Sequence, residues 1–284
     1  MHPAWRRVTL PDFVPIGRNA VDAPSPHSQF LSSVLPRIRQ DARVAGVAVT
    51  GSIAGGHPDI YSDVDLIVVV DDEAFDAVMK DRLTLIGTWA ALVAGFTGEH
   101  VGEPRLIITL VGPPLLHVDF KFVRTSDFAE RAEDPEILWD RDGRLATTLA
   151  GHPPTAPSLD LQWIEDRFWI WVHYGATKLG RGELFETIAF LNYLRETVLG
   201  PLAARRAGAA PRGVRHLESI APNEAHDLQA TLCGYDRHDA GQALLATVQL
   251  YRRWRDEAQA EIARHHHAEK LAMRYLQDVI DRAS

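Results

Sequence analysis

The sequence has only one cysteine, Cys233, in 284 residues. An internal disulfide needs two cysteines, so nothing in the chain points to an oxidising compartment, and Cys233 is predicted to be a small buried hydrophobe. No window of about 18 uninterrupted apolar residues occurs, and Arg6 and Arg7 are not followed by the apolar core of a signal peptide. These absences predict a cytoplasmic protein that does not enter a membrane.

Positive charge is also scarce, with 30 Lys and Arg against 38 Asp and Glu and a net charge of -8. Proteins that hold a nucleic-acid backbone normally carry a basic stripe. The charge balance therefore argues against nucleic acid as a partner and favours a small-molecule acceptor, for example a cationic one. The proportions of 46% hydrophobic and 24% charged residues are those of an ordinary globular protein.

The first half of the chain alternates between patterns typical of strands and of helices. Residues 1–27 are rich in proline and are predicted to be an extended lead-in, and a helix is expected behind Ser25 and Pro26. Residues 73–96 have a helical period. Short apolar runs predict strands at 44–49, 64–70, 105–110, 115–123 and 137–140.

A proline-rich linker at 152–157 is followed by long helical patterns at 163–180, 183–199, about 223–233 and from 240 onward, with a loop at 203–215. The predicted fold is α/β: a catalytic domain at 28–151, made of a small mixed sheet with helices, followed by an all-α substrate-binding domain at 158–284.

The segment between the first two predicted strands contains the residues suited to catalysis. Gly51 permits close approach of the backbone, and Ser52 supplies a hydroxyl, so together they can hold the phosphates of a nucleotide. Asp63 and Asp65 are two positions apart at the start of a strand, which places both carboxylates on one face. Magnesium is usually held by one or two carboxylates together with substrate phosphates.

Asp119 lies in a later strand, where His117, Asp119 and Lys121 alternate with apolar residues. If this strand lies beside the one that carries Asp63 and Asp65, the three acids form a site for two cations about 3.5 to 4 Å apart. Lys121, on the same face, is placed to neutralise phosphate charge.

These residues, in this order, resemble the nucleotidyltransferase superfamily of DNA polymerase beta. The layout is similar to the adenylyltransferases that modify aminoglycoside and lincosamide antibiotics, although many small members carry an arginine where this chain has Gly55. The resemblance implies two Mg²⁺ ions, ATP as substrate, and transfer of AMP to a hydroxyl of a small acceptor such as an aminoglycoside. Asp63, Asp65 and Asp119 would be the catalytic residues and metal ligands.

Trp171, Tyr174, Lys178 and Arg181 share one face of a predicted helix in the second half. With the following Gly-Glu pair they resemble the Arg-Gly-Glu region of the same adenylyltransferases. This implies that Lys178 and Arg181 bind the triphosphate of the nucleotide. Alternatively, these basic residues simply close the carboxyl end of a helix.

Two other functions stay open at this point. The chain could be a non-catalytic or regulatory nucleotide-binding protein of the same fold, or a nucleotidyltransferase that acts on a protein or RNA. Two further groups of polar residues are predicted to be exposed surface without a functional role: Glu99, His100 and Glu103 in a loop, and His265 to His267 on a helix.

Overall fold

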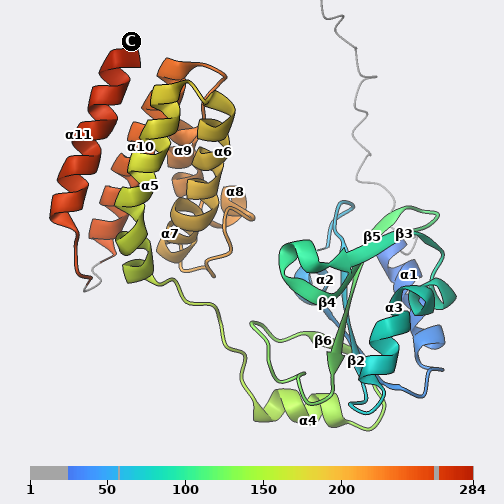
Figure 1. Cartoon of the computed structure of the whole chain (residues 1–284). Coiled ribbons are helices and arrows are strands. Elements are labelled where there is room, and N and C mark those ends of the chain that lie inside the picture. Colours follow the sequence, from blue (N-terminus) through green and yellow to red (C-terminus); the bar gives the residue numbers. More distant parts are fainter. Residues whose placement is uncertain (1–24, 57, 259–261, 284) are drawn as a thin grey trace, which may run out of the picture. The chain divides into compact units, whose positions relative to one another are not determined.

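The computed structural model describes residues 25–56, 58–258 and 262–283, so most of the predicted lead-in lies outside the described residues. The chain divides into two compact units, Met1–Thr155 and Ala156–Ser284 (Figure 1). Within the described residues, no helix combines the length and the apolar character needed to cross a bilayer.

Unit 1 is built on one mixed sheet of six strands in the order β3-β4-β5-β2-β1-β6. β2 and β5 are parallel to each other, and every other neighbouring pair is antiparallel. The strands are β1 (Val44–Thr50), β2 (Val64–Val70), β3 (Leu92–Gly98), β4 (Glu103–Val111), β5 (Leu116–Arg124) and β6 (Glu136–Asp140). The mixed sheet predicted from the sequence is confirmed.

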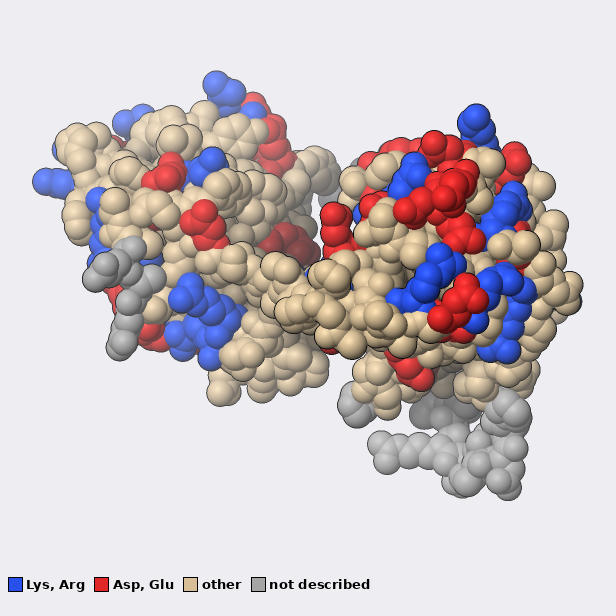
Figure 2. All heavy atoms as spheres, turned by 90° about the horizontal axis from the view of Figure 1, so that it is seen from below, with Lys and Arg blue, Asp and Glu red and all other residues tan. Residues whose placement is uncertain are grey.

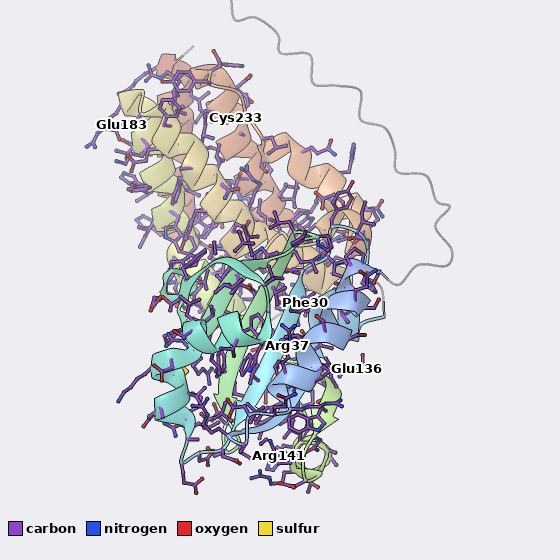
Figure 3. All side chains as sticks on the ribbon, turned by 90° about the vertical axis from the view of Figure 1, so that its right-hand side faces the viewer. Phe30, Arg37, Glu136, Arg141, Glu183 and Cys233 are labelled. Atoms are coloured by element: carbon purple, nitrogen blue, oxygen red, sulfur yellow. The ribbon has the colours of Figure 1, made fainter. Side chains whose placement is uncertain are left out.

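Helices α1 (Pro26–Ile38) and α3 (Phe75–Trp89) cover one face of this sheet. Ser25 caps α1 by accepting a hydrogen bond from the Ser28 amide, as expected from Ser25-Pro26. Phe30 and Arg37 both lie on α1 (Figure 3). Phe30 meets Phe120 of β5 edge to face at 6.5 Å, and Arg37 donates to the carbonyl of Trp89. Fully burying one such aromatic ring contributes roughly 1.5 to 3 kcal/mol.

The alternation of β2 and β5 divides their side chains between the two faces of the sheet. Even-numbered positions such as Leu66 and Phe120 belong to the core beneath α1 and α3. Odd-numbered positions point the other way, and that face is only partly covered, by a small cluster that includes Phe128 and Leu145. The remaining elements of unit 1 are α2 (Gly51–Ala54), η1 (Glu99–Val101) and α4 (Arg144–Gly151).

The helical prediction for 73–96 is wrong at its end. α3 stops at Trp89, and β3 follows as an edge strand that pairs with β4 from Leu92↔Val111 to Gly98↔Glu103. The position of Leu92 fits the apolar spacing of α3, but this residue is part of β3 because the segment pairs with β4. Tertiary pairing here overrides a local period.

Unit 2 is a bundle of helices: α5 (Leu161–Arg181), α6 (Leu184–Leu194), the π-helical turn η2 (Arg195–Leu199), α7 (Gly200–Arg206), α8 (Leu217–Ile220), α9 (Pro222–Leu228), η3 (Gln229–Thr231), α10 (Arg237–Glu257) and α11 (His266–Ala283). The predicted loop at 203–215 is wrong for its first four residues, which complete α7.

His265 was predicted to lie on a helix, but it precedes α11. Its Nε2 is 2.8 Å from Asp166 Oδ1.

A buried polar network holds three parts of unit 2 together. Glu165 of α5 is 0% exposed and accepts hydrogen bonds from the Tyr251 hydroxyl (2.5 Å), the Trp169 indole (3.0 Å), the His265 amide (3.1 Å) and the Arg255 guanidinium (3.1 Å). Burial by itself would raise the pKa of Glu165, but these donors hold it below its ordinary value. The network joins α5 and α10 to the segment before α11.

Candidate active site

Gly51 and Ser52 follow directly on β1, where Thr50 pairs with Asp65 of β2. Gly51 has a φ of +68°, and a Cβ at this position would stand 2.5 Å from Asp65 Oδ2. A side chain at Gly51 would therefore both strain the backbone and push the carboxylate away. The Ser52 hydroxyl oxygen is buried and has no hydrogen-bond partner among the described atoms, so this turn offers an unused donor beside an acid.

The structure brings Asp65 and Asp119 together. They are register partners on the neighbouring parallel strands β2 and β5, which lie about 4.8 Å apart in a sheet. Both are at odd-numbered positions, on the face away from α1 and α3. The condition set by the sequence, that these two strands are neighbours, is thus met, although β3 and β4 lie between them in the chain.

Asp63 lies one residue before β2, and its charge acts on Asp119. Burial raises the pKa of Asp119 above its ordinary value, and repulsion from Asp63 adds to this effect, while a hydrogen bond with His117 opposes it. Asp63 and Asp119 therefore interact electrostatically.

His117 was not among the predicted site residues. Its Nε2 lies 2.9 Å from Asp119 Oδ1, and its side chain is half exposed. The signal that could have found it is its position two residues before Asp119 in an alternating strand, which puts both side chains on the same face.

Glu103 was predicted to be an exposed loop residue, and this prediction is wrong. It is the first residue of β4, and its carboxylate binds Arg105 Nε at 2.8 Å and Lys121 Nζ at 2.9 Å. These cations, Arg105 foremost, lower the pKa of Glu103 to about 2. The ammonium of Lys121, which was expected to face phosphate, is thus already paired with a carboxylate.

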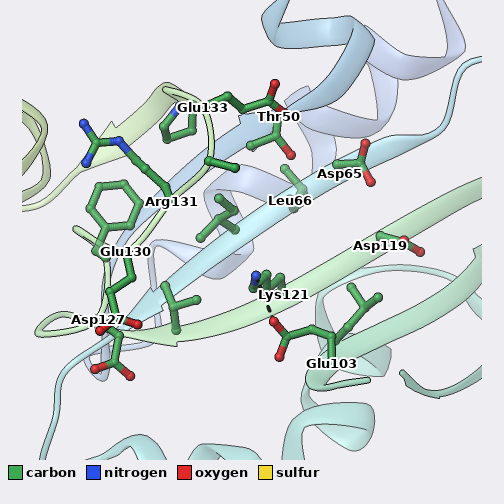
Figure 4. A pocket seen from close by; sticks show the side chains of 16 residues that line it. Thr50, Asp65, Leu66, Glu103, Asp119, Lys121, Asp127, Glu130, Arg131 and Glu133 are labelled. Carbon is green, nitrogen blue, oxygen red and sulfur yellow. Dashed lines mark ion pairs between the residues drawn. The ribbon is translucent and has the colours of Figure 1, made fainter. Parts of the chain in front are cut away.

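A cavity of about 310 Å³ runs along this face of the sheet (Figure 4). Asp65 and Asp119 lie at one end, and residues of the loop after β5 lie at the other. Six carboxylates line it against only two cations, Lys121 and Arg131. The acids are Asp65, Glu103, Asp119, Asp127, Glu130 and Glu133. The acidic loop was not predicted, because its folding back over the sheet is a tertiary feature.

Among the described residues, no three His, Cys, Asp or Glu side chains are gathered closely enough to hold a metal ion by themselves. Magnesium, however, is usually bound through one or two carboxylates and completes its six ligands with substrate phosphates and water. The hard oxygens of Asp63, Asp65 and Asp119, beside the unpartnered Ser52 hydroxyl, fit a magnesium ion that arrives with a nucleotide.

Lys178 and Arg181 lie on α5 in unit 2. The Lys178 ammonium is 2.9 Å from carboxylate oxygens of both Glu183 and Glu186, which raise the pKa of Lys178 above its ordinary value. Arg181 is largely exposed and reaches Glu183 only at 3.8 Å. Their predicted contact with a triphosphate stays a prediction.

A Gly-Ser turn after the first strand, followed by carboxylates on two neighbouring strands of a mixed sheet, is the arrangement of a nucleotidyltransferase. Residues 31–105 match the family model described as nucleotidyltransferase domain. The matched region contains Gly51, Ser52, Asp63 and Asp65. Unit 1 therefore contains a nucleotidyltransferase domain within residues 31–105.

Three solved structures are similar over most of the chain. A nucleotidyltransferase-like protein from Exiguobacterium sibiricum is 14% identical, with 79% of this chain and 74% of that chain covered and a TM-score of 0.39. An aminoglycoside 6-adenyltransferase from Bacillus subtilis is 14% identical, with 88% and 97% covered and a TM-score of 0.36.

The spectinomycin adenyltransferase AAD(9) from Enterococcus faecialis, whose structure holds ATP and spectinomycin, is 11% identical, with 89% and 97% covered and a TM-score of 0.27. No curated protein matches the chain in sequence.

Proposed function

We propose that this protein transfers a nucleoside monophosphate, AMP from ATP, to a hydroxyl group of a small cationic acceptor, with Mg²⁺ as the metal. The observation that carries the proposal is the register pairing of Asp65 with Asp119 beside the Gly51-Ser52 turn. Carboxylates that face one another across parallel strands, next to a turn open to phosphate, suit in-line displacement at phosphorus.

Each residue of the site has a separate task in this reaction. Gly51 lets the backbone approach the phosphates, and the Ser52 hydroxyl donates to a phosphate oxygen. Asp63 and Asp65 hold the metal with the triphosphate, and Asp119 is the third acid and takes part in holding a second ion. Bound Mg²⁺ would neutralise the phosphate oxygens and favour attack at the α-phosphorus.

The acceptor oxygen forms a bond to the α-phosphorus while the bond to pyrophosphate breaks. The proton of the acceptor hydroxyl goes to an oxygen of Asp119, which serves as the base. His117, 2.9 Å from that carboxylate, orients it and can carry the proton onward. Lys178 and Arg181 are assigned to the triphosphate, as the family resemblance implies.

The lining of the cavity supports a cationic acceptor. Six carboxylates against two cations create a negative potential in a concave site, where charge attracts a ligand more strongly than on an open surface. On the face of unit 1 shown in Figure 2, acidic and basic side chains are interspersed. Aminoglycosides, which carry several ammonium groups and hydroxyls, have this chemistry.

The test is pyrophosphate release from ATP and Mg²⁺ in the presence of aminoglycosides, lincosamides and neutral sugars. Release that requires an aminoglycoside and is lost in Asp65→Asn is the expected result. Asp142→Asn, a change of the same type at an exposed acid outside the cavity, is the control and should keep full activity.

Two outcomes would replace the proposal. ATP binding without pyrophosphate release under any condition would identify a non-catalytic nucleotide binder. Labelling of a protein or RNA fraction with AMP, with no reaction on the small-molecule panel, would identify a macromolecular acceptor.

A further inference from the structure

A second cavity, of about 350 Å³, lies in unit 2 and contains none of the carboxylates of the active site. Three helices form it: the last turns of α5, the first residue of α10, and the last turns of α11. α5 is 21 residues long and begins just after the linker from unit 1, so this cavity is about 30 Å along the helix from that linker. Its lining residues are Thr177, Gly180, Arg181, Arg237, Tyr275, Asp278, Val279 and Arg282.

Three guanidinium groups reach this cavity, and their hydrogen-bonding capacity is largely unused. Arg237 donates through one terminal nitrogen to the Gly180 carbonyl at 2.7 Å, but its Nε is buried without a hydrogen-bond partner among the described atoms. Arg282 has no ion-pair partner within the described part of the chain. A buried donor without an acceptor is unfavourable in a folded protein unless a ligand or water completes it.

Two hydroxyl groups add neutral donors to the same wall. The Thr177 hydroxyl and the Tyr275 hydroxyl are 3.4 Å apart, and the Tyr275 ring is stacked on His173 at 4.4 Å, which holds it in place. Asp278 is the single acid of the lining. Three arginines against one aspartate leave the cavity positive in a chain whose net charge is -8.

We propose that Arg237, Arg282 and the two hydroxyls of this cavity bind a small oxyanion of the phosphate type. Guanidinium groups match the geometry of phosphate oxygens through paired N–H donors, and hydroxyls complete such a shell. The side chains border one cavity open to solvent, since Thr177 and Arg181 are one turn apart on α5 and Tyr275, Asp278 and Arg282 share one stripe of α11. The assignment does not depend on the reaction proposed for unit 1.

A competing explanation is that the arginines only stabilise the carboxyl ends of α5 and α11, where the helix dipoles attract cations. The bond from Arg237 to the Gly180 carbonyl has this effect. That hydrogen bond uses only one terminal nitrogen of Arg237, however. Helix stabilisation therefore accounts neither for the buried Nε of Arg237 nor for the exposed Arg282 in a cavity that also contains two hydroxyls. The two explanations differ in whether an added anion is bound.

The experiment measures binding of inorganic phosphate and of AMP to the full chain by calorimetry in magnesium-free buffer. Arg282→Gln changes an exposed residue and Arg237→Gln changes the buried donor; each should weaken binding about tenfold, since a charge-assisted hydrogen bond is lost. Arg253→Gln is the matched control. Arg253 lies on α10, pairs with Asp227 outside the cavity and should have no effect.

The two probes separate the possible sources of the anion. Binding of phosphate assigns the site to a free oxyanion, and binding of AMP alone assigns it to a phosphate monoester; either supports the proposal if both arginine variants weaken it. No binding of either probe would overturn it. So would phosphate binding that is unchanged in both arginine variants and lost in Ser52→Ala, because that would place the anion in unit 1.

Discussion

Gly51→Ala is the substitution that tests the proposed site most directly. At a φ of +68°, an alanine is in the left-handed region, which costs roughly 1 to 2 kcal/mol. Its Cβ would also stand 2.5 Å from Asp65 Oδ2, so the Asp65 side chain must rotate away from its preferred position at about 0.5 to 1.5 kcal/mol. We expect the free energy of unfolding to fall by about 1.5 to 3.5 kcal/mol.

The effect on catalysis should be larger than the effect on stability. If Asp65 holds the metal, displacing its carboxylate by about 1 Å lowers the rate by about a hundredfold. Urea unfolding gives the stability, and pyrophosphate release at saturating Mg²⁺ gives the rate. Both measurements use the full chain.

Gly143→Ala is the matched control for this prediction. Gly143 has nearly the same φ, +73°, but no atom lies within 4 Å of the position that a Cβ would take. The Gly143→Ala variant should lose only the free energy of unfolding that comes from the left-handed backbone, about 1 to 2 kcal/mol, and keep its activity. Equal losses of stability and of rate in the two variants would refute the contact between Gly51 and Asp65 as the reason for glycine at this turn.

Three further substitutions and one double substitution test other parts of the structure. Asp119→Asn should abolish transfer. It should leave the metal-free protein as stable as the unchanged protein, or more stable, at neutral pH. The raised pKa of Asp119 means that the folded state binds this proton more tightly than the unfolded state, so the folded state loses stability as the pH rises through that pKa. Lys178→Ala should raise the KM for ATP more than that for the acceptor. Glu165→Gln should lower stability by about 3 to 5 kcal/mol at neutral pH, since it breaks a buried ion pair; in the unchanged protein this contribution is lost as the pH falls through the lowered pKa of Glu165. The double substitution Asp127→Asn with Glu130→Gln should raise the KM for a cationic acceptor several-fold, at about 0.2 to 1 kcal/mol for each exposed charge.

Each of these results has an outcome that would count against it. Retained transfer in Asp119→Asn would remove Asp119 from the catalytic set, and equal changes of both KM values in Lys178→Ala would remove Lys178 from the triphosphate site. A free energy of unfolding of Glu165→Gln at pH 7 equal to that of the unchanged protein would mean that the network does not stabilise unit 2. A KM effect of the double substitution that persists for a neutral acceptor would contradict charge recognition by the loop.

Much of unit 1 could be predicted because β1 and β2 are short apolar runs and β5 alternates apolar with polar residues. β2 was expected at residues 64–70 and lies at Val64–Val70, and the alternation that exposes Asp65 also exposes Asp119 on β5. β3 could not be predicted in this way, since Leu92 fits a helical period and only the pairing with β4 makes it a strand. Local patterns identify the faces of an element but not its neighbours.

The order of the strands in the sheet could not be predicted from the sequence, although the site depends on it. β2 and β5 are parallel neighbours although β3 and β4 lie between them in the chain, so the pairing of Asp65 with Asp119 depends on a crossover that no local motif encodes. The contact of Glu103 with Lys121 comes instead from the antiparallel pairing of the consecutive strands β4 and β5, and the acidic loop after β5 lines the same cavity. Because Leu66 and Phe120 are fixed in the core by the neighbouring even-numbered positions, a one-residue slip of either strand would bury an aspartate and expose a core residue. The hydrophobic core thus sets the register that places the two carboxylates opposite each other.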